Sequence, residues 1–183
     1  MLVLRSSAAS PFGRKVKIAA ALLGLKDRIK VVMADTLDPS DSLRGQNPLG
    51  KIPALILEDG TTLFDSRVIV EYLDFMAGGD RIIPPVPARF EVLRLQALAD
   101  GITDAAVLRV YEGRFREPDK QEPKWLDHQS GKIERGLTAL ESALPAIEAE
   151  PHVGAIALAC TLGYLDLRAP EWRSAHPRLG EWV

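Results

Sequence analysis

The residues best suited to chemistry are hydroxyls near the start of the chain, above all Ser10. It follows a short apolar run, residues 1–4, and precedes Pro11, which fits the first turn of an amphipathic helix. The first amides of that helix and its dipole suit an anion, whether phosphate, carboxylate or thiolate. A serine before a proline is also an ordinary helix N-cap that needs no ligand. Ser6 and Ser7 lie near the same strand end and are weaker candidates for the same role.

Two more segments combine polar groups with a strand or helix boundary. Ile52-Pro53 stands directly before an apolar run, and X–Pro bonds are the main source of cis peptides. A cis bond here would turn the backbone amide and carbonyl of Ile52 toward a ligand, where a peptide-like substrate could pair with them. Asp65-Ser66 is a helix cap, and its carboxylate, hydroxyl and amides could also hold the zwitterion of an α-amino acid.

The other reactive residue types favour structural roles. Cys160 lies in an apolar helical run and is expected to be a small core residue and not a nucleophile. His128, His152 and His176 are far apart and lack the spacing of a zinc site. The chain has no G-x-G-x-x-G, no Walker-type loop and no G-x-S-x-G elbow. We therefore expect no metal site, and the sequence has no motif that indicates nucleotide binding.

The composition is that of an ordinary globular protein of one large domain or two small ones. Of 183 residues, 46% are hydrophobic and 26% are charged, and the net charge is −2. A charge near zero gives no argument for nucleic acid or an anionic membrane as a partner. No apolar run reaches the ~18–20 residues of a membrane span, and the first residues lack the basic segment of a signal peptide. A single cysteine cannot form an internal disulfide, so we expect a cytoplasmic protein.

The elements that position these residues follow two different patterns. Residues 1–78 alternate strand and helix signals in the order β-α-β-α-β-β-α, which predicts an α/β domain. The strands are expected at 1–5, 28–33, 54–57 and 61–64, and Asp59-Gly60 predicts the hairpin that joins the last two. The Gly- and Pro-rich residues 79–87 predict a linker.

Residues 88–183 predict an all-helical domain. A long helix is expected over 88–115, where Arg109, Arg114 and Arg116 fit a solvated face. An amphipathic stripe steps by four and three residues from Ile133 to Ile147 through Leu137, Leu140 and Leu144. The nearly continuous apolar run 153–167 predicts a buried central helix, and a last helix is expected from residue 176.

Four motifs in this order resemble the glutathione S-transferase family, over essentially the whole chain. Each is weak alone, but the set is specific at these separations. The motifs are Ser10-Pro-Phe-x-Arg-Lys-Val16, Asn47-Pro-x-Gly-Lys-Ile-Pro53, Phe64-Asp65-Ser66 before a helix ending in Glu71-Tyr72-Leu73, and Ala157-Leu-Ala-Cys-x-Leu-Gly-Tyr-Leu-Asp166. Residues 99–106 resemble a bacterial branch of the family.

The resemblance implies a thioredoxin-like domain that binds glutathione and an all-helical domain, with an apolar electrophile between them. It further implies a cytosolic homodimer with a role in detoxification, in which glutathione is the co-substrate. Ser10 matches the position of the serine or cysteine that activates the thiol, and Phe12 belongs to the same motif. Pro53 matches the family's cis-proline, and Ile52 matches the residue that pairs with the cysteinyl backbone.

Five further site residues are implied by the same resemblance. Asp65 and Ser66 match the pair that holds the γ-glutamyl group, and Lys51 matches a polar position near the glycyl end. Asp100 or Asp104 is implied to reach the glutathione of the partner subunit, as an acid at this place does in some classes.

The chain departs from the family pattern in its second half. The last-domain helix usually begins with a Ser/Thr-x-x-Asp capping box, but here Gly154 stands where the Asp would be. We therefore expect this half to depend more on packing. The chain also stops at Val183, earlier than most members, so a segment that covers the electrophile site is expected to be missing.

The leading interpretation is thiol transfer, in which Ser10 donates a hydrogen bond to the glutathione thiolate. Peroxide reduction or dehalogenation on the same thiol is an alternative, whereas a serine cannot form the mixed disulfide of disulfide exchange. A non-catalytic interaction module with the same fold is a third possibility. Retention of Ser10, Pro53, Asp65 and Ser66 argues against that module.

Overall fold

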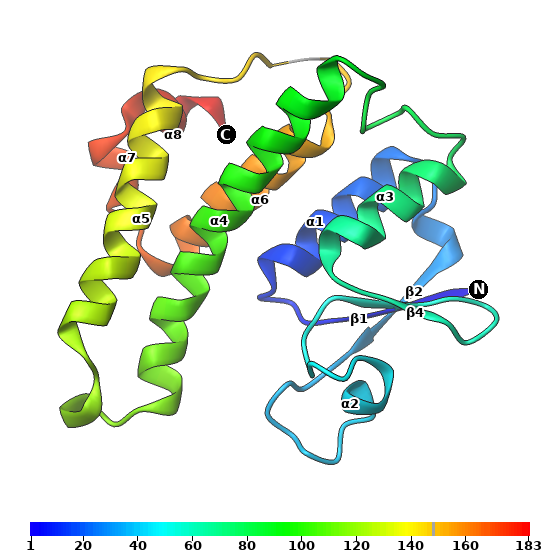
Figure 1. Ribbon diagram of the computed structural model, residues 1–183, viewed down its shortest axis with the longest axis horizontal. Coiled ribbons are helices and arrows are strands. Elements are labelled where there is room, and N and C mark those ends of the chain that lie inside the picture. Colours follow the sequence, from blue (N-terminus) through cyan, green and yellow to red (C-terminus); the bar gives the residue numbers. More distant parts are fainter. Residues whose placement is uncertain (148) are drawn as a thin grey trace.

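The N-terminal part is built on a four-stranded mixed sheet in a computed structural model that describes residues 1–147 and 149–183. The strand order is β2-β1-β3-β4, with β1 parallel to β2 and antiparallel to β3, which pairs antiparallel with β4 (Figure 1). In the central strand, Leu4 lies opposite Val31 on one side and Leu55 on the other. The strands are β1 (Leu2–Ser6), β2 (Ile29–Met33), β3 (Ala54–Ile56) and β4 (Thr62–Leu63).

Two helices cover one face of this sheet, and a third, short helix lies on its other side (Figure 1). Leu4 and Leu55 of the sheet, Val16 of α1 and Ile69 of α3 have no exposed surface, so the core lies between the sheet and these helices. The helices are α1 (Pro11–Leu22), α2 (Leu43–Gln46) and α3 (Ser66–Met76), with a 3₁₀ turn at Lys26–Arg28. The element order confirms the predicted α/β domain.

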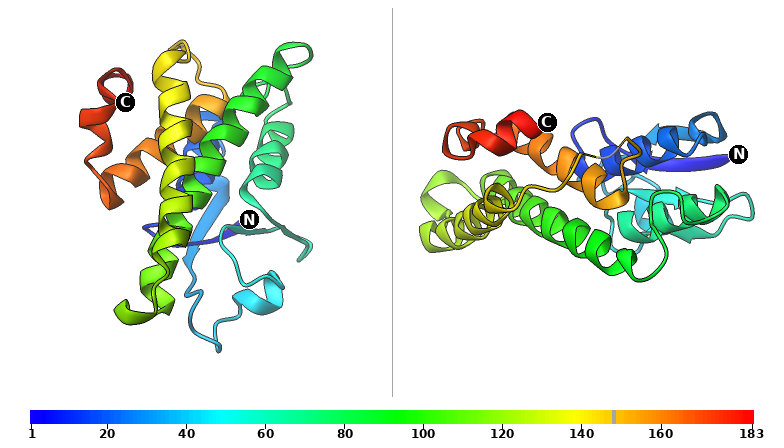
Figure 2. Two further views of the ribbon diagram at one scale, coloured as in Figure 1. Left: turned by 60° about the vertical axis from the view of Figure 1, so that its left-hand side comes forward. Right: turned by 90° about the horizontal axis from the view of Figure 1, so that it is seen from above.

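The rest of the chain is helical, as predicted, and α6 is its buried centre. This helix packs against α4 on one side and against α1 of the N-terminal domain on another (Figure 2). Its nearly continuous apolar sequence follows from these two neighbours, because both faces are covered. The helices are α4 (Ala88–Phe115), α5 (Pro123–Ser142), α6 (Val153–Arg168), α7 (Trp172–Ala175) and α8 (Pro177–Trp182), with a 3₁₀ turn at Pro118–Lys120.

The amphipathic stripe predicted through residue 147 is wrong at its end. Helix α5 stops at Ser142, so Leu144 and Ile147 lie beyond it, and the Ile147 side chain is exposed. Pro145 accounts for the difference, since proline disfavours helical backbone in the residue before it and cannot donate a helical hydrogen bond.

Helix α6 has an N-cap although the Ser/Thr-x-x-Asp capping box of the family is absent. The Nδ1 atom of His152 accepts a hydrogen bond from the amide of Ala155 at 3.1 Å, so an imidazole does the work of the missing Ser or Thr. Gly154 has a packing role, because a Cβ atom there would lie 2.7 Å from the carbonyl oxygen of Val92 in α4. Gly154 therefore allows α6 to approach α4 closely.

The segment between α3 and α4 contains the predicted linker, 79–87, and it is anchored to both domains. The Asp74 carboxylate accepts from the amides of Arg81 and Ile82, and the carbonyl of Ile82 accepts from the amide of Val153 in α6. The exact domain limits stay a prediction. Within the described residues, no helix combines the length and the hydropathy that crossing a membrane requires.

Candidate functional site

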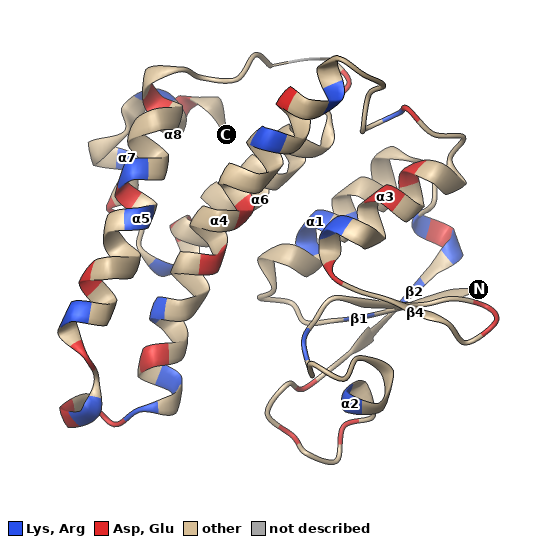
Figure 3. Ribbon diagram, in the orientation of Figure 1, with Lys and Arg blue, Asp and Glu red and all other residues tan. Residues whose placement is uncertain are grey.

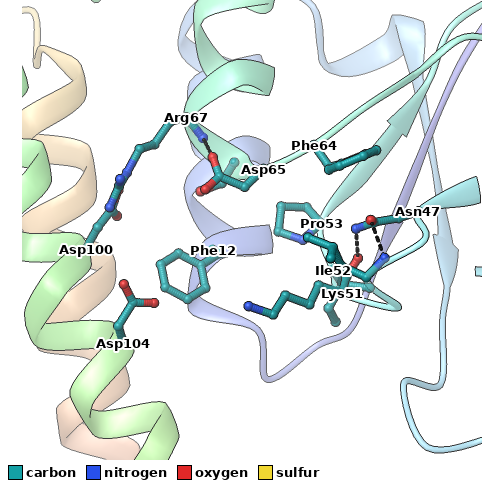
Figure 4. A pocket seen from close by; sticks show the side chains of 12 residues that line it. Phe12, Asn47, Lys51, Ile52, Pro53, Phe64, Asp65, Arg67, Asp100 and Asp104 are labelled. Atoms are coloured by element: carbon teal, nitrogen blue, oxygen red, sulfur yellow. Dashed lines mark hydrogen bonds and ion pairs between the residues drawn. The ribbon is translucent and has the colours of Figure 1, made fainter. Parts of the chain in front are cut away.

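Most of the predicted site residues meet at one cavity of about 110 Å³ between the N-terminal domain and α4. Phe12 of α1, residues between 47 and 53, residues 64–67 at the start of α3, and Asp100 and Asp104 of α4 line it (Figure 4). The fold brings these segments together because α1 and α3 begin, and the loop before β3 lies, at the same end of the sheet.

The loop before β3 is shaped by Asn47, whose side chain is almost fully buried. Its Nδ2 donates to the carbonyl of Lys51 at 2.9 Å, and its Oδ1 accepts from the amide of Leu49 at 3.0 Å. Gly50 has a φ of +60°, which an L side chain would disfavour, and this closes the turn. The loop thereby presents the Lys51 side chain to the cavity (Figure 4).

The Ile52–Pro53 peptide bond is cis, and both residues line the cavity. Within the described residues, neither the amide nor the carbonyl of Ile52 takes part in a hydrogen bond, whereas β3 begins to pair two residues later. A free amide and carbonyl at the end of a strand are the groups that a peptide-like ligand would use.

Asp65 and Ser66 stand at the start of α3. Asp65 is the N-cap, and its Oδ1 accepts from the amide of Arg67 at 2.9 Å. Ser66 is buried and lines the cavity with Asp65. The capping role predicted for this pair is thus present, and it leaves the second carboxylate oxygen of Asp65 without a partner in the described part of the chain.

Asp100 joins three helices around this cavity. Both of its carboxylate oxygens accept from Nζ of Lys15 in α1, at 2.7 and 2.8 Å, and one also accepts from Nε of Arg67 in α3 at 2.9 Å. Lys15 is 1% exposed, and burial lowers its pKa although the Asp100 carboxylate opposes that shift. Contact of Asp100 or Asp104 with a partner subunit's glutathione stays a prediction, and within its own chain Asp100 already binds two cations.

Sequence reasoning missed Arg67. Its Nε is held by Asp100, and its two terminal nitrogens have no partner among the described residues, so they remain available at the cavity. One signal was present in the sequence. A cation in the first turn of a helix interacts unfavourably with the helix dipole, so an arginine there indicates a role other than helix stabilisation. Asn47 belongs to the 47–53 motif, but its role in shaping the loop was not predicted from the sequence.

The charges at the cavity are mixed. Lys51 and Arg67 supply cations, while Asp104 adds a carboxylate whose pKa is raised by burial and by neighbouring Asp100. Lys51 and Arg67 oppose that rise. A ligand that carries both ammonium and carboxylate groups fits this distribution.

The three candidate serines lie beside the cavity and not in its lining. The Oγ atom of Ser10 accepts from the amide of Gly13 at 3.0 Å and caps α1. Ser6 has no exposed surface, and Ser7 is half-buried at the same turn. A Cβ atom on Gly13 would lie 2.0 Å from Oγ of Ser6, so glycine is required for the serines to pack here. Phe12 connects this turn to the cavity.

Cys160 is buried between α6 and the N-terminal core, and burial raises its pKa to about 11. Its sulfur therefore stays a protonated thiol at neutral pH. Over residues 1–147 and 149–183, no group of three or more His, Cys, Asp or Glu side chains is arranged to hold a metal ion.

Comparison with known proteins gives this geometry a context. Residues 9–75 match the family described as glutathione S-transferase, N-terminal domain, and residues 123–183 match glutathione S-transferase, C-terminal domain. An uncharacterized GST-like protein of Escherichia coli (strain K12), YibF, is 34% identical over 98% of this chain and 91% of its own length. This chain belongs to the glutathione S-transferase family.

Solved structures of other family members agree. A glutathione transferase family member from Pseudomonas fluorescens Pf-5 with bound glutathione has a TM-score of 0.92 and 45% identity, covering 100% of this chain and 92% of that one. A structure from the same organism with bound S-(propanoic acid)-glutathione has a TM-score of 0.87 and 44% identity, with the same coverage. These matches confirm the predicted thioredoxin-like and all-helical architecture of a glutathione S-transferase. A serine-type active site stays a prediction.

Proposed function

We propose that this protein is a glutathione transferase that binds glutathione in the cavity and activates its thiol for attack on an apolar electrophile. The observation that carries the proposal is the free backbone of Ile52 in the same cavity as Asp65, Ser66, Lys51 and Arg67. Together they offer a strand-like edge for a peptide, an acid and a hydroxyl for an amino-acid terminus, and two cations for carboxylates. The relatives with bound glutathione support this choice of ligand.

The proposed pose follows from the chemistry of each end of the tripeptide. The γ-glutamyl ammonium lies at Asp65 and its carboxylate at Ser66 and Arg67, while the cysteinyl backbone pairs with Ile52. Lys51 receives the glycyl carboxylate. The sulfur then faces the first turn of α1, near Ser10.

Ser10 is proposed to stabilise the thiolate. A thiol with a pKa of ~8.5 is mostly protonated at neutral pH. The Ser10 oxygen accepts from the Gly13 amide through a lone pair, which leaves its O–H free to donate to sulfur. The thiolate then attacks the electrophilic carbon, a C–S bond forms, and the leaving group departs with its electron pair. The S-substituted glutathione bound by a relative supports a site that admits a group on sulfur.

The test of this function is glutathione binding with and without Arg67. We expect the wild type to bind glutathione in isothermal titration calorimetry, and Arg67→Ala to weaken binding by about tenfold, the usual cost of a charge-assisted hydrogen bond. Arg135→Ala, an exposed arginine on α5, is the matched control and should bind normally. Absence of binding by the wild type at millimolar glutathione would favour a non-catalytic module with the same fold.

We also propose that the protein is a cytoplasmic homodimer that pairs through the outer face of α3. Val68 and Phe75 are exposed at helical spacing on this face, with Phe75 74% exposed. Between them, Glu71 forms an ion pair with Arg89 at the start of α4, so α4 adjoins the same surface.

Phe75→Glu is expected to convert the dimer to a monomer, because it places an unpaired charge in a buried apolar interface. Sedimentation equilibrium measures the change in mass. Leu167→Glu, an exposed apolar position on α6, should leave the mass unaltered. A wild type that is monomeric at micromolar concentration would contradict the proposal.

A further inference from the structure

Arginine side chains lie over tyrosine rings where α4 and α6 approach their C-terminal ends. The guanidinium carbon of Arg114 is 5.4 Å from the ring centroid of Tyr111, and that of Arg168 is 5.7 Å from the ring of Tyr164. Both distances are in the range of cation–π contacts, which hold the guanidinium planes in place. We call these four residues the arginine–tyrosine cluster.

The two arginines of the cluster are exposed, and no carboxylate of the described residues lies within ion-pair distance of either. Two arginines close to them in the sequence do form ion pairs: Arg116 pairs with Glu112, and Arg173 pairs with Asp166. Basic positions recur along the C-terminal half of α4 (Figure 3). Two guanidinium groups that are oriented by aromatic rings and lack a protein anion form a place for an external one.

Tyr111 relates the cluster to the cavity, although none of the four residues lines it. Tyr111 follows Asp104 by seven residues, so both lie on the face of α4 that borders the cavity. Tyr164 directly follows Gly163, and a Cβ atom on Gly163 would lie 3.3 Å from Nη1 of Arg14. Arg14 belongs to the first turn of α1, where its amide donates to the carbonyl of Ser10 at 2.9 Å. This part of α6 therefore lies against the first turn of α1, which follows Ser10.

We propose that the electrophile is a planar molecule with a carboxylate, which pairs with Arg114 and Arg168 while its carbon skeleton lies against Tyr111. Tyr164 is 7% exposed and holds Arg168 from within the helical core. The proposal rests on the transferase function proposed above, and it replaces the wholly apolar electrophile proposed there with one whose apolar ring carries a carboxylate. Asp104 disfavours an anion at the cavity end of this face, so the carboxylate is directed toward the arginines and the reacting carbon toward the sulfur.

The contrast between a charged and a neutral electrophile tests this directly. The probes are 4-chloro-3,5-dinitrobenzoate and its methyl ester, which share the ring and the leaving group. In both, the glutathione sulfur forms a bond to the ring carbon that bears chlorine, the C–Cl bond breaks, chloride leaves with the electron pair, and the thiol proton passes to solvent. The readout is kcat/KM for each probe divided by its uncatalysed rate.

We expect the wild type to prefer the benzoate by at least about tenfold, and the double variant Arg114→Gln/Arg168→Gln to lose about tenfold or more of that preference. Arg135→Gln on α5 is the control and should retain the wild-type preference. The anionic substrate class would be overturned by a wild type that does not prefer the benzoate, or by a double variant that keeps the wild-type preference. In either case, turnover of the ester would still support the transferase function. Failure to turn over either probe would overturn both.

Discussion

Replacing Asp100 with leucine is expected to destabilise the protein by about 3–5 kcal/mol at neutral pH, the usual cost of leaving one member of a buried ion pair without its partner. The abandoned charge is Lys15, which is 1% exposed and has both Asp100 oxygens as its hydrogen-bond acceptors. Arg67 loses the same acceptor, but its side chain is about half exposed and water replaces the lost contact. Urea unfolding measures the change.

The deficit of the Asp100→Leu variant should shrink as the pH rises. Burial lowers the pKa of Lys15, and the Asp100 carboxylate opposes that shift, so its removal lowers the pKa further. The folded variant then binds fewer protons than the unfolded chain between this lowered pKa and the ordinary lysine value of 10.5. The free energy of unfolding rises with pH wherever the unfolded state holds more protons than the folded state. The difference in this free energy between the wild type and the variant therefore narrows between neutral pH and about pH 9.5.

A double-mutant cycle separates the charge effect from packing. Lys15→Met combined with Asp100→Leu removes both charges and should cost much less than the sum of the single variants, since apolar replacement of a buried pair is often nearly neutral. If the losses in the free energy of unfolding of the two single variants add up in the double variant, the side chains between α1 and α4 stabilise the protein by packing alone. A Lys15→Met variant alone should lose less than Asp100→Leu, because Asp100 retains Arg67.

The sequence was most informative where a local rule applies. The bounds of α4 coincide with the predicted 88–115, because the proline-rich linker before it and the long helical pattern are both local features. The cavity segments 47–53 and 65–66 were located for the same reason. The cap of α6 was missed because histidine is not among the usual N-cap residues, although its Nδ1 reaches the Ala155 amide.

The remaining features depend on how the two domains pack. Lys15, Arg67 and Asp100 are far apart in sequence, and each looks like an ordinary charged residue on an amphipathic helix. Only the approach of α4 to α1 and α3 joins them into one ion-pair network, in which Lys15 and Asp100 are buried. Arg114 and Arg168 could not be predicted for the same reason. In the sequence, arginines that contact tyrosine rings cannot be told from arginines on a solvated helix face.

Ser10→Ala is expected to lower turnover at neutral pH by at least tenfold, while glutathione binding largely persists. The hydroxyl is proposed to stabilise the thiolate, and each unit by which it lowers the thiol pKa corresponds to ~1.4 kcal/mol. The variant should therefore recover activity as the pH rises toward the ordinary thiol pKa of ~8.5. A profile of kcat against pH measures both effects.

The capping role of Ser10 must be separated from this effect. Its Oγ accepts from the Gly13 amide, so the alanine variant also loses about 1 kcal/mol of helix stability. Ser10→Thr retains both the cap and the hydroxyl and should keep most activity. Ser10→Asp retains the cap acceptor but has no proton to donate at neutral pH, so it should fold normally and lose turnover. Alanine turnover equal to wild type across neutral pH would assign Ser10 to capping alone. Ser7 would then be the next candidate, because Ser6 has no exposed surface.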